Sequence, residues 1–222
     1  VAYIPAYGRK SSVIWNCVEL DRFRPGENPK ASAPFRFICV ASMGSRKNSR
    51  RLAEALALLK QRSDKPFELR WVGRYNERNP DQRNNMAETR SLIERYALGG
   101  EFVFAGEVVN VESEYRQADA VVLVSTREGL PNAVCEGIAS GLPIVAGAVS
   151  DIPRIVRDGE NGFLCDPWNV ANIAQALEKC LALSPDERAR FGAASRRIAE
   201  SLLGKSGFLR EYEALYETLL GK

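Results

Sequence analysis

Residues 35–73, FRFICVASMGSRKNSRRLAEALALLKQRSDKPFELRWVG, decide the fold class of this chain. The stretch begins and ends with apolar runs that are typical of buried strands, one from Phe35 and one from Phe67. Between them, apolar residues recur at helical spacing on one face, namely Leu52, Ala55, Leu56 and Leu59. A strand, a helix and a strand in this order predict a βαβ unit with parallel strands.

The same alternation continues toward the C-terminus. We expect further strands in EFVFAG, DAVVLVS, LPIVAGA and GFLC, with helices near 87–97, 111–118, 132–140 and 152–156. The polar stretch at residues 74–85, between the strand that begins at Phe67 and the helix near 87–97, is predicted to be a surface loop. The predicted fold class is therefore α/β: a doubly wound, Rossmann-like parallel sheet of about six strands, with helices on both faces and extra C-terminal helices.

The two ends of the chain differ from this central part. Residues 1–34 are irregular and rich in Pro and Gly, as a linker segment is. Near the other end, four apolar residues follow one another at helical spacing: Phe208, Tyr212, Leu215 and Leu219. An apolar stripe of this kind indicates a helix whose one side needs another surface to cover it.

Composition excludes several function classes. The 222 residues are 45% hydrophobic and 27% charged, and 31 basic against 28 acidic residues leave a net charge of +3, too small to indicate nucleic acid. The apolar runs are too short for a membrane span and no export signal is present, so a cytoplasmic location is expected. Five cysteines without a Cys-x-x-Cys pair, and no histidine, argue against a disulfide framework, a metal site and a His-based triad.

The loops that follow the strands hold the candidate site, because ligands of open parallel sheets bind at the carboxyl edge. The first loop, SMGSRKNSRR, gathers four cations at a helix start: Arg46, Lys47, Arg50 and Arg51. Such a cluster favours a phosphate ligand; the alternative is a set of solvated charges on an exposed turn.

A second loop, STREGLPNAVCEGIASGLPIVA, carries two carboxylates. Glu128 lies in the loop and Glu136 about one turn into the next helix, so both can face one crevice. The turn between them leaves backbone N–H groups of a helix N-terminus available for a diphosphate. Carboxylates beside a phosphate site suggest recognition of sugar hydroxyls; the alternative is a pair of surface glutamates.

Three segments of the chain resemble a known family. VIWNCVELDRFRP resembles its interdomain segment, EGLPNAVCEGIASGLPIVA its Glu-x7-Glu signature, and VSDIPRIVRDGENGFLCDP its G-x-P-E-I-V-x-D-G-x-N-G-x-L-V-x-P stretch. Together they are similar to the C-terminal, donor-binding domain of the retaining, nucleotide-sugar-dependent GT-B glycosyltransferases (glycosyl transferases group 1). One departure is Ser42, which stands where the family commonly has an Arg on the diphosphate; Arg46 is the expected replacement.

The resemblance implies roles for individual residues. Glu128 and Lys47 are implied as catalytic, with Glu128 on the donor sugar's hydroxyls near the reacting carbon. Donor sugar and diphosphate binding are implied for Lys47, Arg46, Ser42, Gly129, Leu130, Pro131 and Asn132. Ribose and base binding are implied for Glu136, Val108 and Glu107.

The resemblance also implies an activity. A sugar moves from a nucleoside diphosphate sugar, such as a UDP- or GDP-sugar, to an acceptor hydroxyl with retention, as in bacterial polysaccharide biosynthesis, without a metal or other cofactor. The implied acceptor is a glycan or lipid-linked glycan, and peripheral membrane contact is implied only for the full enzyme. The alternatives are a non-catalytic nucleotide-sugar-binding module, or an epimerase or phosphorylase of the GT-B fold.

The implied domain organisation has three parts. Residues 1–34 are expected to be an interdomain linker segment, 35–205 a nucleotide-sugar-binding Rossmann-like domain, and 206–222 a C-terminal helix that docks on an absent N-terminal domain. Because the reaction of this family takes place between two domains, the chain alone is expected to be inactive as a hexosyltransferase.

Overall fold

The computed structural model describes residues 12–26 and 34–221, and its centre is a single parallel sheet. The six strands are β1 (Phe35–Val40), β2 (Phe67–Val72), β3 (Phe102–Gly106), β4 (Ala120–Leu123), β5 (Ile144–Gly147) and β6 (Gly162–Cys165). Their order, β3-β2-β1-β4-β5-β6, reverses between β1 and β4. The predicted doubly wound α/β fold is confirmed, and the loops after β1 and β4 meet at the point where ligands of such sheets bind.

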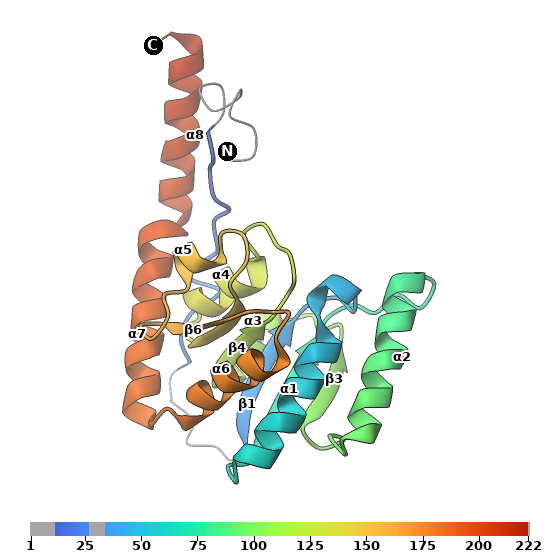
Figure 1. The fold of residues 1–222 in the computed structure, drawn as a ribbon. Coiled ribbons are helices and arrows are strands. Elements are labelled where there is room, and N and C mark those ends of the chain that lie inside the picture. Colours follow the sequence, from blue (N-terminus) through green and yellow to red (C-terminus); the bar gives the residue numbers. More distant parts are fainter. Residues whose placement is uncertain (1–11, 27–33, 222) are drawn as a thin grey trace.

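Helices cover both faces of the sheet (Figure 1). One face carries α1 (Ser49–Arg62), α2 (Pro80–Arg95) and α6 (Val170–Ala182). The other carries α3 (Val111–Gln117), α4 (Asn132–Ala139) and α7 (Pro185–Leu202). The short elements η2 (Ser45–Lys47) and α5 (Ile152–Ile155) lie in loops at the carboxyl edge, and α8 (Lys205–Leu220) follows α7.

The central strands are buried because both faces are covered. All four residues of β4 and all four of β5 are buried, which explains why these strands are continuous apolar runs instead of alternating ones. Helix α4 lies close to β4 because residue 137 is glycine: a Cβ there would come within 2.5 Å of Val121 Cγ2. This close contact fixes the position of the helix that carries Glu136.

One sequence prediction is wrong in part. The polar stretch 74–85, predicted to be a loop, is helical from Pro80, where α2 begins. The Asn79 side chain accepts a hydrogen bond from the Gln82 N–H at 3.2 Å, and proline occupies the first helical turn. Because the start is capped in this way, a helix with few apolar residues can form here.

The described part of the predicted linker packs on the α/β body. Val18 pairs with Gly204 in an isolated parallel bridge, and its N–H donates to the Leu203 carbonyl at 2.9 Å. Phe23 is buried, and its ring packs edge-on against that of Tyr115, with centroids 5.9 Å apart. The rest of the predicted linker, residues 1–11 and 27–33, lies outside the described residues.

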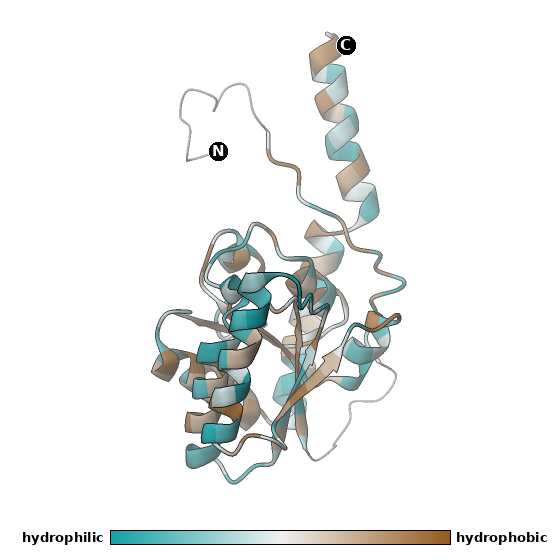
Figure 2. Ribbon diagram, turned by 90° about the vertical axis from the view of Figure 1, so that its right-hand side faces the viewer, coloured by the Kyte–Doolittle hydropathy of each residue, from teal (hydrophilic) through white to brown (hydrophobic). Residues whose placement is uncertain are grey.

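Helix α8 projects away from the body beyond the carboxyl edge of the sheet (Figure 1). None of its side chains from 205 to 220 is buried, and Figure 2 shows apolar residues along its length. The most exposed large apolar side chains of this helix are Leu209, Tyr212, Tyr216, Leu219 and Leu220. Among the described residues, no helix combines the length and apolarity that crossing a bilayer requires.

Candidate functional site

Asn48 ties together three loops at the carboxyl edge. It lies between η2 and α1 in the left-handed conformation, with φ 64°, and is 2% exposed. Its Nδ2 donates to the Val124 carbonyl at 2.9 Å and to the Pro167 carbonyl at 2.7 Å, in the loops that follow β4 and β6. These bonds position the turn after β1 relative to the loop that carries Glu128. This role of Asn48 was not predicted from the sequence.

Lys47 and Glu128 come together across the edge of the sheet. Lys47 Nζ lies 2.5 Å from Glu128 Oε1, and the two side chains are only 15% and 9% exposed. The backbone supports the contact, because the Thr126 N–H donates to the Arg46 carbonyl at 3.0 Å. The structure therefore brings the predicted phosphate cation and the predicted sugar carboxylate into one site.

The remaining residues of the basic cluster divide into two groups. Arg46 is exposed, and no hydrogen bond or ion pair of its guanidinium is recorded within residues 12–26 and 34–221. Arg50 pairs with Glu88 of α2, and Arg51 donates to Asn48 Oδ1 at 3.1 Å. Of the four predicted cations, Lys47 and Arg46 are thus the two that are not engaged by α2 or Asn48. Ser42, two residues after β1, is half-buried.

The N-terminus of α4 opens toward the same edge. Pro131 is the cap residue and offers no side-chain hydrogen bond, and within the described parts of the chain no acceptor is recorded for the N–H groups of Asn132 and Ala133. Gly129 and Asn132 are exposed, whereas Leu130 packs partly against the core. These N–H groups and the helix dipole favour an anion close to Glu128.

Glu136 lies one turn into α4 and is held by Tyr115. The Tyr115 hydroxyl donates to Glu136 Oε2 at 2.9 Å. Burial raises the pKa of Glu136 above its ordinary value, while the Tyr115 hydrogen bond and the charge of Arg22 act in the opposite direction. The carboxylate is thus partly dehydrated and suited to accept hydrogen bonds from a ligand.

The predicted base-binding residues follow β3. Val108 is half-buried and packs against the core, and Glu107 is exposed. In the sheet order, β2 separates β3 from β1. Within the described ranges, no hydrogen bond or ion pair connects Glu107 to Lys47 or Glu128. Glu107 and Val108 therefore lie at the same carboxyl edge as the other candidates, on a strand that is not adjacent to β1.

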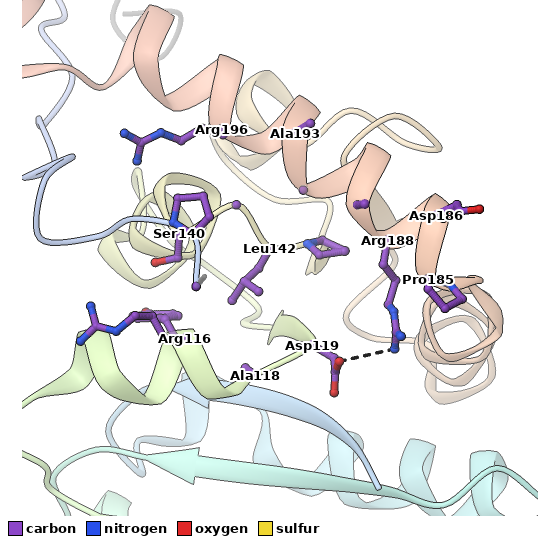
Figure 3. Close-up of a pocket in the computed structure, with 17 residues that line it drawn as sticks. Arg116, Ala118, Asp119, Ser140, Leu142, Pro185, Asp186, Arg188, Ala193 and Arg196 are labelled. Carbon is purple, nitrogen blue, oxygen red and sulfur yellow. Dashed lines mark hydrogen bonds and ion pairs between the residues drawn. The ribbon is translucent and has the colours of Figure 1, made fainter. Parts of the chain in front are cut away.

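A cavity of about 580 Å³ lies at the opposite, amino edge of the sheet (Figure 3). It lies between the ends of α3 and α4 and the start of α7, and Arg188 pairs with Asp119 in it at 3.4 Å. None of the candidate residues lines this cavity. The candidate site lies instead at the carboxyl edge, where the ion pair and the helix N-terminus converge.

Comparison with known proteins identifies the family of the chain. The family model "Glycosyl transferases group 1" matches residues 22–198. EpsD of Bacillus subtilis, which carries the name of a glycosyltransferase, is 30% identical over 203 residues, covering 86% of this chain and 50% of EpsD. The chain spans half or less of the length of the curated relatives it matches.

Two solved structures share the fold. Sucrose-phosphate synthase of Thermosynechococcus elongatus has a TM-score of 0.84 at 23% identity, over 97% of this chain and 56% of that protein. HepE of Anabaena, solved in complex with UDP-glucose, has a TM-score of 0.80 at 19% identity, over 95% of this chain and 57% of that protein. The fold is that of a GT-B C-terminal domain.

Proposed function

Because the chain belongs to the glycosyl transferases group 1 family, we propose that it binds a nucleoside diphosphate sugar at the carboxyl edge of its sheet. In this proposal the domain is the donor half of an enzyme that transfers the sugar to an acceptor hydroxyl with retention. The observation that carries the proposal is the Lys47–Glu128 ion pair beside the open N-terminus of α4. A cation, a carboxylate and free N–H groups at one place match the parts of a nucleotide sugar.

The diphosphate lies on the positive groups. An ammonium group has three N–H donors, and Glu128 accepts from Lys47, so two donors are left for phosphate oxygens. Arg46 and the N–H groups of Asn132 and Ala133 add further positive charge. In the reaction these groups stabilise the negative charge that develops on the leaving diphosphate.

Glu128 binds the sugar. Its carboxylate can accept several hydrogen bonds, and Lys47 occupies one position, which leaves capacity for sugar hydroxyls next to the reacting carbon. The ion pair also fixes the carboxylate relative to the phosphate cation. In this way one pair aligns the sugar with its leaving group.

Glu136 binds the ribose, and the loop after β3 binds the base. An ionised carboxylate accepts but does not donate, which suits two neighbouring ribose hydroxyls. The partly exposed side chain of Val108 offers an apolar surface to the base, with Glu107 beside it. The UDP-glucose bound to HepE, which shares this fold, supports a UDP-sugar as the first donor to test.

The acceptor is bound by a second domain in this proposal. Curated relatives are about twice as long as the match to this chain, and α8 exposes apolar side chains that no described residue covers. A donor domain can position only one of the two reactants, so transfer by these 222 residues alone is expected to be negligible.

Calorimetry with UDP, GDP and ADP, each in EDTA, tests the proposal. At least one nucleotide is expected to bind without metal, and Lys47→Ala is expected to weaken it about 10- to 100-fold because a charge-assisted hydrogen bond is lost. Lys60→Ala is the control, since Lys60 pairs with Glu101 instead. Equal affinities of Lys47→Ala and the parent chain, or binding only with Mg²⁺ or Mn²⁺, would contradict the proposal.

A further inference from the structure

Tyr115 of α3 buries a hydroxyl group beside the candidate ribose carboxylate. The side chain is 0% exposed. Its oxygen lies 2.9 Å from Glu136 Oε2 and 3.1 Å from the Ala133 carbonyl oxygen. A phenol has one proton, and both neighbours are acceptors while Glu136 is ionised, so the charged carboxylate is the preferred acceptor.

Packing holds the ring of Tyr115 next to this contact. Its ring packs edge-on against Phe23 of the segment 12–26, and α3 fixes its backbone. A buried hydroxyl needs a hydrogen-bond partner. The rigid position of Tyr115 therefore determines where Oε2 of Glu136 lies.

The two oxygens of Glu136 differ in their surroundings. Oε2 accepts from Tyr115, whereas within residues 12–26 and 34–221 no hydrogen bond to Oε1 is recorded. We propose that Tyr115 is a positioning residue for Glu136: its hydroxyl holds one carboxylate oxygen and leaves the other for the ribose of the donor nucleotide. The ribose part of this inference rests on the proposed function, whereas the Tyr115–Glu136 part stands on the structure.

The hydroxyl also affects the charge of Glu136. Burial raises the pKa of Glu136, whereas the Tyr115 hydrogen bond and the charge of Arg22 lower it. The negative charge of Glu112 raises this pKa by a smaller amount. Arg22 and Glu112 pair with each other at 3.0 Å. The neighbouring thiol of Cys135 has a pKa of about 12 and stays neutral. Among the described residues, the Tyr115 hydroxyl is thus the one donor that forms a hydrogen bond with the Glu136 carboxylate.

A first experiment needs no ligand. The side-chain carboxyl carbon of Glu136 is titrated by NMR in the parent chain and in Tyr115→Phe, which keeps the ring and its packing on Phe23. The midpoint is expected to move up by about one pH unit in the variant. Tyr96→Phe, which removes the hydroxyl of a partly exposed tyrosine elsewhere, is expected to leave it unchanged. An unchanged midpoint in Tyr115→Phe overturns the inference.

A second experiment measures UDP affinity against pH in the same three proteins. At pH 5.5, Tyr115→Phe is expected to bind UDP about tenfold more weakly than the parent chain. At pH 8 Glu136 is ionised in both proteins, so the difference in affinity is expected to shrink to a few-fold. Comparison with the parent chain cancels the ionisation of UDP itself. The same pH profile in Tyr115→Phe and the parent chain overturns the positioning role.

Glu136→Ala separates this inference from the proposed function. If that variant binds UDP as the parent chain does, the proposed ribose contact fails, and the carboxyl titration still decides whether Tyr115 controls Glu136. If Glu136→Ala weakens UDP and Tyr115→Phe has no effect at any pH, the ribose contact stands and the role of Tyr115 fails.

Discussion

Lys47 Nζ and Glu128 Oε1 lie 2.5 Å apart, although 81 positions separate the two residues in the chain. Both side chains are largely buried. Loss of one partner from a buried ion pair leaves the other charge dehydrated and unpaired, which costs more than the intact pair contributes. The stability of the folded chain therefore depends on keeping both partners or on removing both charges together.

Replacement of Lys47 by Met is expected to lower the free energy of unfolding by roughly 3 kcal/mol, because Glu128 is left unpaired. The double variant Lys47→Met with Glu128→Gln is expected to recover most of that stability but not the affinity for UDP. Urea denaturation and calorimetry measure the two quantities separately. Recovery of UDP affinity in the double variant would show that Lys47 does not bind phosphate.

The two carboxylates are expected to respond to different ligands. Glu136→Ala should weaken UDP about tenfold, because a hydrogen-bonded carboxylate is lost from the ribose. Glu128→Ala should leave the affinity for UDP within about threefold and weaken only the matching UDP-sugar, because the proposed function assigns Glu128 to the sugar hydroxyls. Calorimetry with UDP and UDP-glucose on both variants makes the comparison. If both variants bind both ligands like the parent chain, these glutamates are not part of a nucleotide-sugar site.

Asn48→Ala is expected to destabilise the chain by about 3 kcal/mol. The change removes two hydrogen bonds to buried carbonyls, of Val124 and Pro167, and places alanine at a positive φ. Asn48→Gly separates these effects, because glycine tolerates the backbone conformation and should lose less stability. Urea unfolding of the three proteins measures both contributions; an unchanged midpoint for Asn48→Ala would contradict this role.

The charge of Glu136 is expected to make the folded state less stable as pH rises. Because its pKa is raised in the folded protein, the unfolded chain releases this proton at lower pH than the folded one. The resulting stabilisation is present below the ordinary value of 4.5 and is lost as pH rises through the folded-state pKa. The free energy of unfolding of Glu136→Gln minus that of the parent chain should therefore increase over this window. Urea unfolding between pH 4 and 7.5 measures this difference in unfolding free energy. A difference that stays constant over that range would contradict a raised pKa of Glu136 in the folded protein.

The sheet could be predicted from sequence because its strands are short apolar runs between helices with one apolar face. The prediction of a loop was wrong for residues 80–85. These residues belong to α2, whose buried positions include Asn85, Met86 and Thr89. Two of these three are polar, so hydropathy gives little periodic signal. Asn79 as a cap residue and Pro80 after it are the sequence features that indicate a helix here. They mark where a helix begins, but they do not show which of its faces is buried.

Sequence could predict those candidate site residues that lie in, or directly after, the loops that follow the strands. Lys47, Glu128 and Glu136 follow buried strands, and the order of the strands brings those loops together. Asn48 and Tyr115 were not predictable, because their roles depend on partners in other segments. A buried Asn or Tyr has the same local sequence pattern as an exposed one.

The bridge between Val18 and Gly204 also has a mechanical consequence. Residues 12–17 and helix α8 extend in the same direction beyond the carboxyl edge (Figure 1), and Asn16 Nδ2 donates to Asn132 Oδ1 at 3.5 Å. A load that pulls residues 12–17 away from the sheet acts on the contact of Asn16, and then on the Val18–Gly204 bridge and the Val18 to Leu203 hydrogen bond. These contacts lie outside the six-stranded sheet, and Arg196 holds the carbonyls of Leu20 and Phe23 behind them, so the junction can yield while the carboxyl edge of the sheet keeps its shape.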